Sequence, residues 1–158
     1  MTEEILELLQ ADGRLTYAEL ANRLNITEAE AQAKVAELEN SGVICGYTAI
    51  VNNDSPFSVK ALIEVKVSPS RDGGFDRVAR RIARYPEVSE LCLVSGSFDL
   101  LITIRGRSLQ EVANFVASKL ATIDGVISTS TGFMLKKYKE SGRILEQEEE
   151  YERLKVTP

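Results

Sequence analysis

Hydrophobic residues near the start of the chain recur at every third or fourth position, which is the spacing of amphipathic helices. Up to about residue 44 this pattern predicts three helices. The first has an inward stripe of Ile5, Leu6 and Leu9, can be capped by Thr2, and ends at Asp12-Gly13.

Two capping boxes mark the starts of the next two helices. In this motif a Ser or Thr hydroxyl and a Glu carboxylate three residues later each accept a hydrogen bond from a free backbone N–H. The boxes are Thr16 with Glu19 and Thr27 with Glu30. They predict helices over about 17–24 and about 28–40, with Asn25 in the turn between them. Two short helices separated by so few residues form a helix-turn-helix.

Beyond the third helix the periodicity changes. Residues 43–51 are β-prone and predict a connecting strand, and turn-forming residues up to Pro56 place a domain boundary there. From Phe57 to Val67 apolar and polar residues largely alternate, which is the period of a strand with one buried face.

The remaining elements alternate between the helical spacing and the period of two that is typical of strands. They are a helix over about 75–82, strands at about 88–95 and 98–105, a helix over about 109–120 opened by a third capping box (Ser108 with Glu111), and a strand at about 126–138. The order βαββαβ is that of the ferredoxin-like fold, an antiparallel sheet with two helices on one face. The predicted fold class is therefore α+β, with a helix-turn-helix domain at 1–50, a linker at 51–56, a βαββαβ domain at 57–140 and an acidic amphipathic helical tail at 141–158.

Apolar residues also predict what covers the other face of the sheet. Strand positions on both faces are apolar, namely Leu62, Leu91, Leu93, Leu101 and Leu135. Because the two helices cover only one face, these residues favour packing against a second subunit.

Composition narrows the possible functions. The chain has 158 residues, 44% of them hydrophobic, with no histidine and two cysteines. It contains neither an apolar run long enough to predict a membrane span nor a secretory leader, so the expected location is the cytoplasm. Cys45 and Cys92 lie in apolar stretches and are predicted to be buried thiols.

The absence of histidine removes the commonest general base and the most versatile metal ligand. The phosphate-loop, dinucleotide-binding and zinc-protease motifs are absent as well. We therefore expect no enzyme activity, no cofactor and no metal site.

Charge is distributed unevenly along the chain. The net charge is −5, but residues 1–50 contain three basic and nine acidic side chains and carry −6, which leaves +1 for the remainder. An acidic helix-turn-helix is unfavourable for DNA, because affinity comes largely from neutralising phosphates. Positive charge can come from one side of the predicted 75–82 helix and the residues after it, which carry Arg77, Arg80, Arg81 and Arg84. Such a face is more often simply solvated.

Four motifs occur in a characteristic order and spacing. They are Ile5-Leu6-x-x-Leu9-Gln10-x-x-Gly13-Arg14, Glu19-Leu20-Ala21, Leu38-Glu39-x-x-Gly42-Val43-Ile44-x-Gly46-Tyr47 and Ser95-Gly96-Ser97-Phe98-Asp99-Leu100-Leu101. Together they resemble the Lrp/AsnC family of feast-or-famine transcriptional regulators, over nearly the whole chain. The resemblance implies a winged-helix-like DNA-binding domain, a ferredoxin-like effector and oligomerisation domain, homodimers that assemble further, and often an amino acid as effector.

The physics of DNA readout places the N-terminal half of the third helix in the major groove of double-stranded DNA. There Gln32 can bond an adenine edge and Lys34 a phosphate or guanine, while Glu28 repels the backbone and can at best accept from cytosine. Thr27 can bond a phosphate. The candidate DNA-binding residues are Thr16, Thr27, Glu28, Ala31, Gln32 and Lys34. The acidic residues of this helix are also explained as solvated helix formers.

By resemblance, an amino acid would bind between dimers at the turn around Gly96 and at the last strand. Glycine lets a backbone approach a ligand closely, and Asp99 offers a carboxylate to an α-amino group. The candidate effector-binding residues are Gly96, Ser97, Asp99, Thr129, Thr131 and Gly132. Alternatively, Gly96 and Ser97 only form the hairpin, and Asp99 caps or pairs locally.

Three functions are compatible with these features. The favoured one is a sequence-specific DNA-binding regulator that oligomerises and responds to a small metabolite, an amino acid by resemblance. The second, suggested by the acidic third helix, is an amino-acid-binding oligomeric sensor whose helix-turn-helix no longer binds DNA. The third is a siroheme decarboxylase, because that family resembles the same two-domain layout; it relies on histidine, which this chain lacks.

Overall fold

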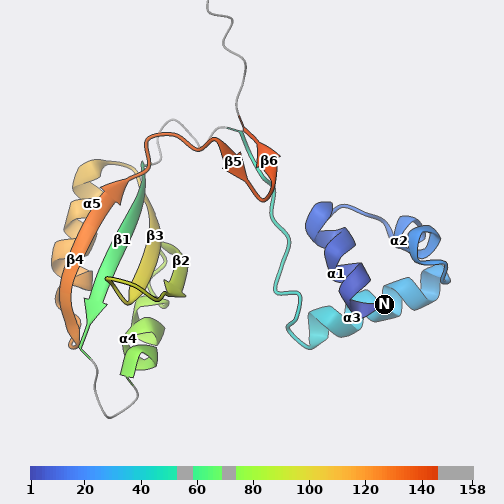
Figure 1. Cartoon of the computed structure of the whole chain (residues 1–158), viewed down its shortest axis with the longest axis horizontal. Helices are drawn as coiled ribbons and strands as arrows, with labels where there is room; N and C mark the ends of the chain where they lie inside the picture. The colour runs from blue at the N-terminus through green and yellow to red at the C-terminus, as the bar shows by residue number, and fades with distance from the viewer. Residues whose placement is uncertain (53–58, 69–73, 146–158) are drawn as a thin grey trace, which may run out of the picture. The chain divides into compact units, whose positions relative to one another are not determined.

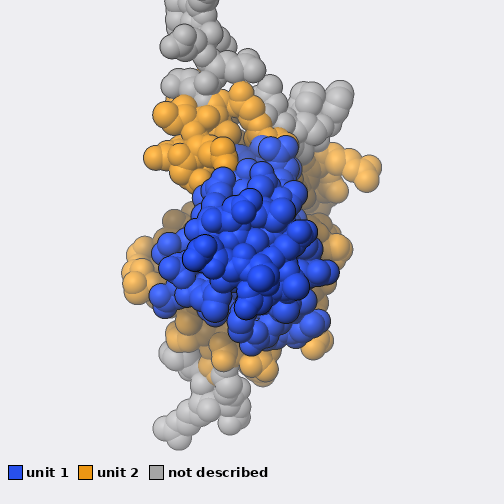
Figure 2. All heavy atoms as spheres, turned by 90° about the vertical axis from the view of Figure 1, so that its right-hand side faces the viewer, with its two compact units in different colours: residues 1–50 blue, residues 51–158 orange. Residues whose placement is uncertain are grey.

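The computed structural model describes residues 1–52, 59–68 and 74–145. The chain forms two compact units, residues 1–50 and 51–158 (Figure 2), and each has a hydrophobic core of its own. Most of the predicted linker at 51–56, the strand start at Phe57 and the tail from residue 146 onwards lie outside the described residues.

Unit 1 is a bundle of three helices, as the apolar spacing predicts. They are α1 (Thr2–Ala11), α2 (Tyr17–Leu24) and α3 (Glu28–Asn40) (Figure 1). Their buried side chains are Ile5, Leu20, Ala21, Ala31, Val35 and Leu38. The predicted cap at Thr2 is wrong, because Thr2 is itself helical and Met1 occupies the cap position without a side-chain hydrogen bond.

Both capping boxes of the helix-turn-helix are confirmed. The Thr16 amide donates to Glu19 Oε2 at 2.8 Å, and the Glu19 amide donates to Thr16 Oγ1 at 3.2 Å. Thr27 and Glu30 make the same pair of bonds at the same distances. Asn25 follows α2 with φ 55°, the left-handed conformation that asparagine tolerates at a helix end.

No strand forms over residues 43–51, although the β-prone sequence predicts one. A strand needs a hydrogen-bonded neighbour, and no described residue pairs with this segment. It is instead attached to unit 1 by Tyr47, whose hydroxyl donates to Glu39 Oε1 at 3.0 Å and whose ring lies against Gly13. Burial, together with the hydrogen bond to Glu39, raises the pKa of Tyr47.

Unit 2 has the predicted βαββαβ order, followed by a short hairpin. Its elements are β1 (Val59–Val67), α4 (Gly74–Ile82), β2 (Val88–Leu93), β3 (Leu100–Gly106), α5 (Leu109–Phe115), the π-helical turn η1 (Val116–Leu120), β4 (Val126–Phe133), β5 (Lys139–Glu140) and β6 (Arg143–Ile144). The four long strands form an antiparallel sheet in the order β2-β3-β1-β4 (Figure 1). This is the ferredoxin-like arrangement.

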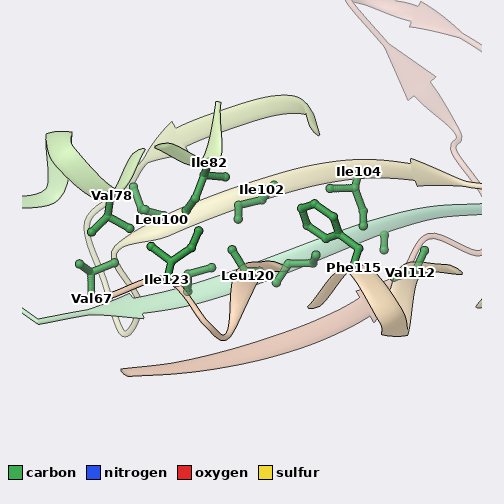
Figure 3. Close-up of a cluster of buried hydrophobic side chains, with 13 residues drawn as sticks. Val67, Val78, Ile82, Leu100, Ile102, Ile104, Val112, Phe115, Leu120 and Ile123 are labelled. Atoms are coloured by element: carbon green, nitrogen blue, oxygen red, sulfur yellow. The ribbon is translucent and has the colours of Figure 1, made fainter. Parts of the chain in front are cut away.

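The core of unit 2 lies between one face of this sheet and the helices. Its buried side chains are Ala61, Ile63, Val65 and Val67 of β1, Val78 and Ile82 of α4, Leu100, Ile102 and Ile104 of β3, and Val112, Phe115, Leu120 and Ile123. Figure 3 shows these side chains gathered between the strands and the helices. Burying an aliphatic side chain of this size contributes roughly 1.5–3 kcal/mol, so this layer is a main source of the unit's stability.

No described helix covers the opposite face of the sheet, which we call the open face, although Lys60 and Thr103 are buried on it. Leu62 and Leu101 point to this open face and are half-buried, as predicted. Leu91 does not, because it faces the helices and packs on the core. Leu93 and Leu135 are exposed, the first at the end of the edge strand β2 and the second beyond β4. The apolar part of the open face is therefore smaller than predicted.

Both cysteines are exposed in the single chain, so the prediction of buried thiols is wrong. Cys45 lies in the segment that forms no strand. Cys92 is on β2 and pairs with Leu101, whose side chain points to the open face. Apolar neighbours in sequence do not bury a side chain that faces away from the core.

Helix α5 begins with only half of the predicted capping box. The Glu111 amide donates to Ser108 Oγ at 3.1 Å, but the Glu111 carboxylate accepts from the Arg107 amide at 2.6 Å and not from that of Ser108. Leu109, predicted to face inward, is exposed at the first helical position, whereas Val112 is buried as predicted.

The chain after β4 forms a hairpin where the start of a helix is predicted. Strands β5 and β6 pair around Ser141 and Gly142, whose φ values are 45° and 80°. Two successive positive φ angles are typical of a type I′ turn, which joins antiparallel strands. The helix prediction is therefore wrong for 141–145, and its remainder at 146–158 lies outside the described residues.

Within the described ranges, every helix is too short or too polar to cross a bilayer. The same ranges hold no group of three or more Cys, Asp or Glu side chains placed to bind a metal ion.

The capping boxes predict how unit 1 responds to acid. The hydrogen bonds from Thr16 and Thr27 lower the pKa of Glu19 and Glu30 below the ordinary value of 4.5. A carboxyl whose pKa is lowered by folding stabilises the fold above its ordinary pKa, and this contribution is lost as pH falls through the lowered value. Gln keeps the box geometry without titrating. We therefore expect the melting temperature of E19Q/E30Q to fall less than that of wild type on acidification below about pH 4.5.

Thermal unfolding followed by circular dichroism, from neutral to strongly acidic pH, measures this difference. The matched control is E3Q/E7Q, which changes two exposed glutamates of α1 for which the structure shows no hydrogen bond. If the melting temperatures of E19Q/E30Q and E3Q/E7Q fell equally little on acidification, the proposed role of the capping boxes would be contradicted.

Candidate DNA-binding and effector sites

The predicted DNA-binding residues lie at the start of α2 and along α3. Glu28 and Gln32 are exposed, as a contact residue must be. Ala31 is not a contact residue, because none of its surface is exposed. It belongs to the unit 1 core, one helical turn before the equally buried Val35, so its inclusion among the DNA contacts is wrong.

The hydroxyls of Thr16 and Thr27 belong to the capping boxes. Thr16 Oγ1 donates to Glu19 Oε2 at 2.8 Å, and Thr27 Oγ1 donates to Glu30 Oε2 at 2.7 Å. The capping box itself needs each hydroxyl only as an acceptor, so the hydroxyl proton can turn from the carboxylate to a phosphate while the box stays closed. The predicted phosphate contact of Thr27 stays a prediction that this geometry permits.

Lys34 is held by a neighbour on its own helix. Its Nζ lies 2.7 Å from Glu37 Oε2, and 39% of the lysine side chain is exposed. Ion pairs at a surface contribute about 0–1 kcal/mol, so a phosphate can replace Glu37 at small cost. The role of Lys34 stays a prediction that this geometry permits.

The face of α3 opposite the core carries two residues that the sequence reasoning missed. Since successive residues turn by about 100°, Ala29 and Ala33 lie across the helix from Val35 and Leu38, with Gln32 beside them. Both alanines are exposed. Alanine methyl groups can contact thymine methyl groups, and Gln can bond adenine in the major groove. The helical spacing of the buried residues was the signal that could have identified this face.

The predicted effector turn joins β2 to β3. Gly96 and Ser97 are exposed, and Gly96 has φ 143°, in the region that favours glycine. Asp99 is only 17% exposed, and its carboxylate has local partners. Its Oδ2 accepts from the Val67 amide at 2.8 Å, and its Oδ1 lies 3.5 Å from Lys66 Nζ. The local pairing that the sequence left open for Asp99 is therefore present.

The predicted residues of β4 lie on two different faces of the sheet. The register places Thr129 and Thr131 on the face covered by the helices and Gly132 on the open face. Because β4 is an edge strand, Thr131 and Gly132 remain exposed and Thr129 is half-buried.

Asp99 and Thr129 flank β1 at the same level. The Asp99 amide donates to Val65 O at 2.9 Å, and Thr129 pairs with Val65 from the other side. Two strand spacings separate them, which is about 10 Å. A single chain therefore places the six predicted effector residues at one end and one edge of the sheet without closing them into a pocket.

A cavity of about 160 Å³ lies elsewhere in unit 2, and none of the predicted effector residues lines it. It is bounded by β3, α5 and η1, and its main charged groups neutralise each other, because Lys119 Nζ donates to Glu87. This bond lowers the pKa of Glu87. The Lys119 ammonium also lies 5.5 Å and 5.9 Å from the ring centres of Tyr85 and Phe115. These contacts of Lys119 hold η1 against the segment before β2, which contains Tyr85 and Glu87.

Two family models match the chain. The Lrp/AsnC ligand binding domain matches residues 60–144, and a winged helix-turn-helix DNA-binding domain matches residues 2–44. The first match begins in β1 and ends in β6, and the second includes all three helices of unit 1.

Individual proteins are similar over the same length. The uncharacterized HTH-type transcriptional regulator YugG of Bacillus subtilis is 42% identical over 158 residues, covering 98% of this chain and 95% of that protein. A transcriptional regulator of Neisseria meningitidis, solved in complex with L-Met, is 26% identical with a TM-score of 0.68, covering 88% of this chain and 90% of that one. AsnC of E. coli shares the fold at 24% identity, with a TM-score of 0.64 over 88% of this chain and 93% of that one.

Replacing Asp99 by Ala tests whether this residue stabilises the fold in the absence of any ligand. The change leaves the Val67 amide without its acceptor and Lys66 without its counter-ion. Hydrogen bonds to charged groups contribute about 1.5–3 kcal/mol, so we expect the ligand-free D99A chain to lose roughly that much free energy of unfolding. Urea denaturation measures it, with S97A in the exposed turn as the control expected to match wild type. A D99A chain as stable as wild type would refute the structural role.

Proposed function

Because the chain belongs to the Lrp/AsnC family of transcriptional regulators, we propose that it binds specific DNA sequences as a homo-oligomer and that an amino acid controls this binding. The observation that carries the proposal is the combination, in one chain, of a DNA-binding helix-turn-helix and an Lrp/AsnC ligand binding domain. The family consists of regulators and not of enzymes, so the siroheme decarboxylase hypothesis is set aside.

We assign the reading of DNA to the outer face of α3. The centre of that face is neutral and small, with Ala29 and Ala33 beside Gln32. In the major groove these side chains are suited to thymine methyl groups and an adenine edge, so the proposed target contains A·T pairs at these positions. Lys34 supplies a phosphate contact after releasing Glu37. With so few cations on α3, binding through this helix alone should be weak and should depend only shallowly on salt concentration.

The proposed effector is an amino acid bound where the β2–β3 turn meets the end of β1. Such a ligand carries an ammonium and a carboxylate, which complement the Asp99 and Lys66 pair. Lys66 is 43% exposed, so its ammonium can turn to a ligand. The L-Met complex of the Neisseria meningitidis relative supports the ligand class.

Assembly of subunits is proposed on the open face of the sheet. Leu62 and Leu101 are half-buried there, and no described element of the same chain covers them. The sheet also ends in two uncovered edge strands, β2 and β4, which offer backbone groups to a neighbour. A copy packed here would enclose the dispersed effector residues that one chain leaves open.

Gln32→Ala tests the DNA-reading role of α3. A lost base contact costs about 1–3 kcal/mol, so we expect roughly 5- to 150-fold weaker binding to the preferred site and a relaxed base preference. Gel shifts with the protein's own upstream DNA, run across a salt series, measure both. Gln10→Ala changes an exposed glutamine of α1 and should bind like wild type.

Complete failure of the wild type to retain duplex, even at low salt, would reject DNA binding. It would favour the second candidate, an amino-acid-binding oligomer with an inactive helix-turn-helix. The acidic residues beside the neutral face, Glu28 and Glu30, are the observation on which that candidate depends.

The effector proposal predicts that one amino acid, or a few of similar shape, raises the melting temperature of the full chain. A ligand at about 100 times its Kd stabilises the folded state by about 2.7 kcal/mol. A thermal-shift screen of the common amino acids measures this, and T131V should reduce the shift while T48V, a threonine of unit 1, should not. A shift that both variants retain in full would remove Thr131 from the site, and no shift with any amino acid would reject the ligand class.

A further inference from the structure

The outer side of α4 and the turn after it carry four arginines that the proposed function does not use. The inner side packs on the sheet through Val78 and Ile82. The exposed basic residues are Arg77, Arg80, Arg81 and Arg84, which we call the arginine stripe, and one exposed acidic residue, Asp76, precedes them. At about 100° per residue they fall within an arc of about 100°, opposite the buried side chains. Arg84 lies just after α4, where its amide donates to Arg81 O at 3.4 Å.

Most of this positive charge is not neutralised by the chain itself. Arg77 Nη2 lies 3.5 Å from Asp124 Oδ2, an exposed pair of small energetic value. For Arg80, Arg81 and Arg84 the structure shows no ion pair with any residue in 1–52, 59–68 or 74–145. Three guanidinium groups are thus available to an external anion.

The stability of α4 explains the stripe only in part. Arg80 and Arg81 lie in the last turn, where the helix dipole favours cations. Arg77 with Arg81 is a like-charged pair four residues apart, which destabilises a helix by about 0.2–0.5 kcal/mol. The dipole does not account for Arg77 in the first half of the helix or for Arg84 beyond its end.

We propose that the arginine stripe binds the phosphate backbone of the DNA that the helix-turn-helix recognises. The proposal rests on the proposed DNA binding and supplies what unit 1 lacks, since residues 1–50 carry −6 and the cation of α3, Lys34, is paired with Glu37. From Arg80 to Arg84, the part of the stripe without described ion pairs, the length along the helix axis is about 6 Å. One strand of DNA carries about two phosphates over that length, so the stripe can contact about two phosphates of one strand.

The salt dependence of DNA binding tests the stripe. Each phosphate contact contributes about −0.9 to the slope of log K against log salt concentration. We expect R80Q/R84Q to make the slope shallower by about 1.8, equally on the upstream duplex and on an unrelated duplex of the same length. Its preference between the two duplexes should not change, because phosphate contacts carry no sequence information.

The matched control is R107Q/K139Q. It removes the same charge from two exposed residues of unit 2 for which the structure shows no ion pair, and it should keep the wild-type slope. Gln is a good helix former, and removing the repulsion between Arg80 and Arg84 offsets the loss of a cation from the last turn of α4, so R80Q/R84Q should melt close to wild type.

The outcomes separate this inference from the function on which it rests. If wild type binds duplex and R80Q/R84Q keeps its slope, the stripe does not bind DNA, while recognition by α3 stands. If the control loses as much slope as R80Q/R84Q, the effect is one of net charge and the inference is equally overturned. If wild type binds no duplex at the lowest salt, the DNA-binding function and the stripe fail together.

Discussion

Burial of one face of β1 against α4 and α5 is the interaction on which the rest of unit 2 depends. Side chains alternate along a strand. Because Ala61, Ile63 and Val65 lie in the core, Leu62 and Glu64 lie on the opposite face. A slip of one residue would exchange the two sets, and the registers with β3 and β4 are fixed for that reason. Asp99 reinforces this register, because its amide and its carboxylate both bond the end of β1. The candidate effector turn is therefore positioned by the hydrophobic core.

Local sequence signals predicted the ends of α2 correctly, where one side chain satisfies one backbone group. Thr16 with Glu19 marks the start of α2 and Asn25 its end. The same kind of signal failed at Thr2, which does not cap α1, and formed only half a box at Ser108. Sequence signals also failed where the outcome depends on a distant partner: residues 43–51 have strand propensity but no described strand to pair with, and Cys92 has apolar neighbours but faces away from the helices. The DNA contacts show the same limit, since Ala29, Ala31 and Ala33 are the same residue type. Only the position of the core separates the buried alanine from the exposed ones.

The predicted effector residues of β4 are dispersed because side chains alternate along a strand. Thr131 is on the side of the helices and Gly132 on the open face, and both are exposed because β4 is an edge strand. A ligand that needs residues from both faces is bound tightly only when a second copy adds a wall. Ligand binding and assembly are then thermodynamically linked, and each strengthens the other by the same factor. Under the proposed function, DNA affinity responds to the ligand through the number of helix-turn-helix units that the assembly presents.

The acidic charge of unit 1 acts over distance more than at the contact face. Several of its carboxylates are engaged locally: Glu19 and Glu30 in capping boxes, Glu37 with Lys34, and Glu39 with Tyr47. The two capping-box carboxylates lie at helix starts, whereas Glu37 follows Ala33 by one helical turn and borders the neutral centre of the outer α3 face. The field of these acidic groups extends over a Debye length of about 8 Å at physiological salt. Attraction over that range must therefore come from cations elsewhere on the chain, and we propose that it comes from Arg80, Arg81 and Arg84, which form no ion pair with any described residue.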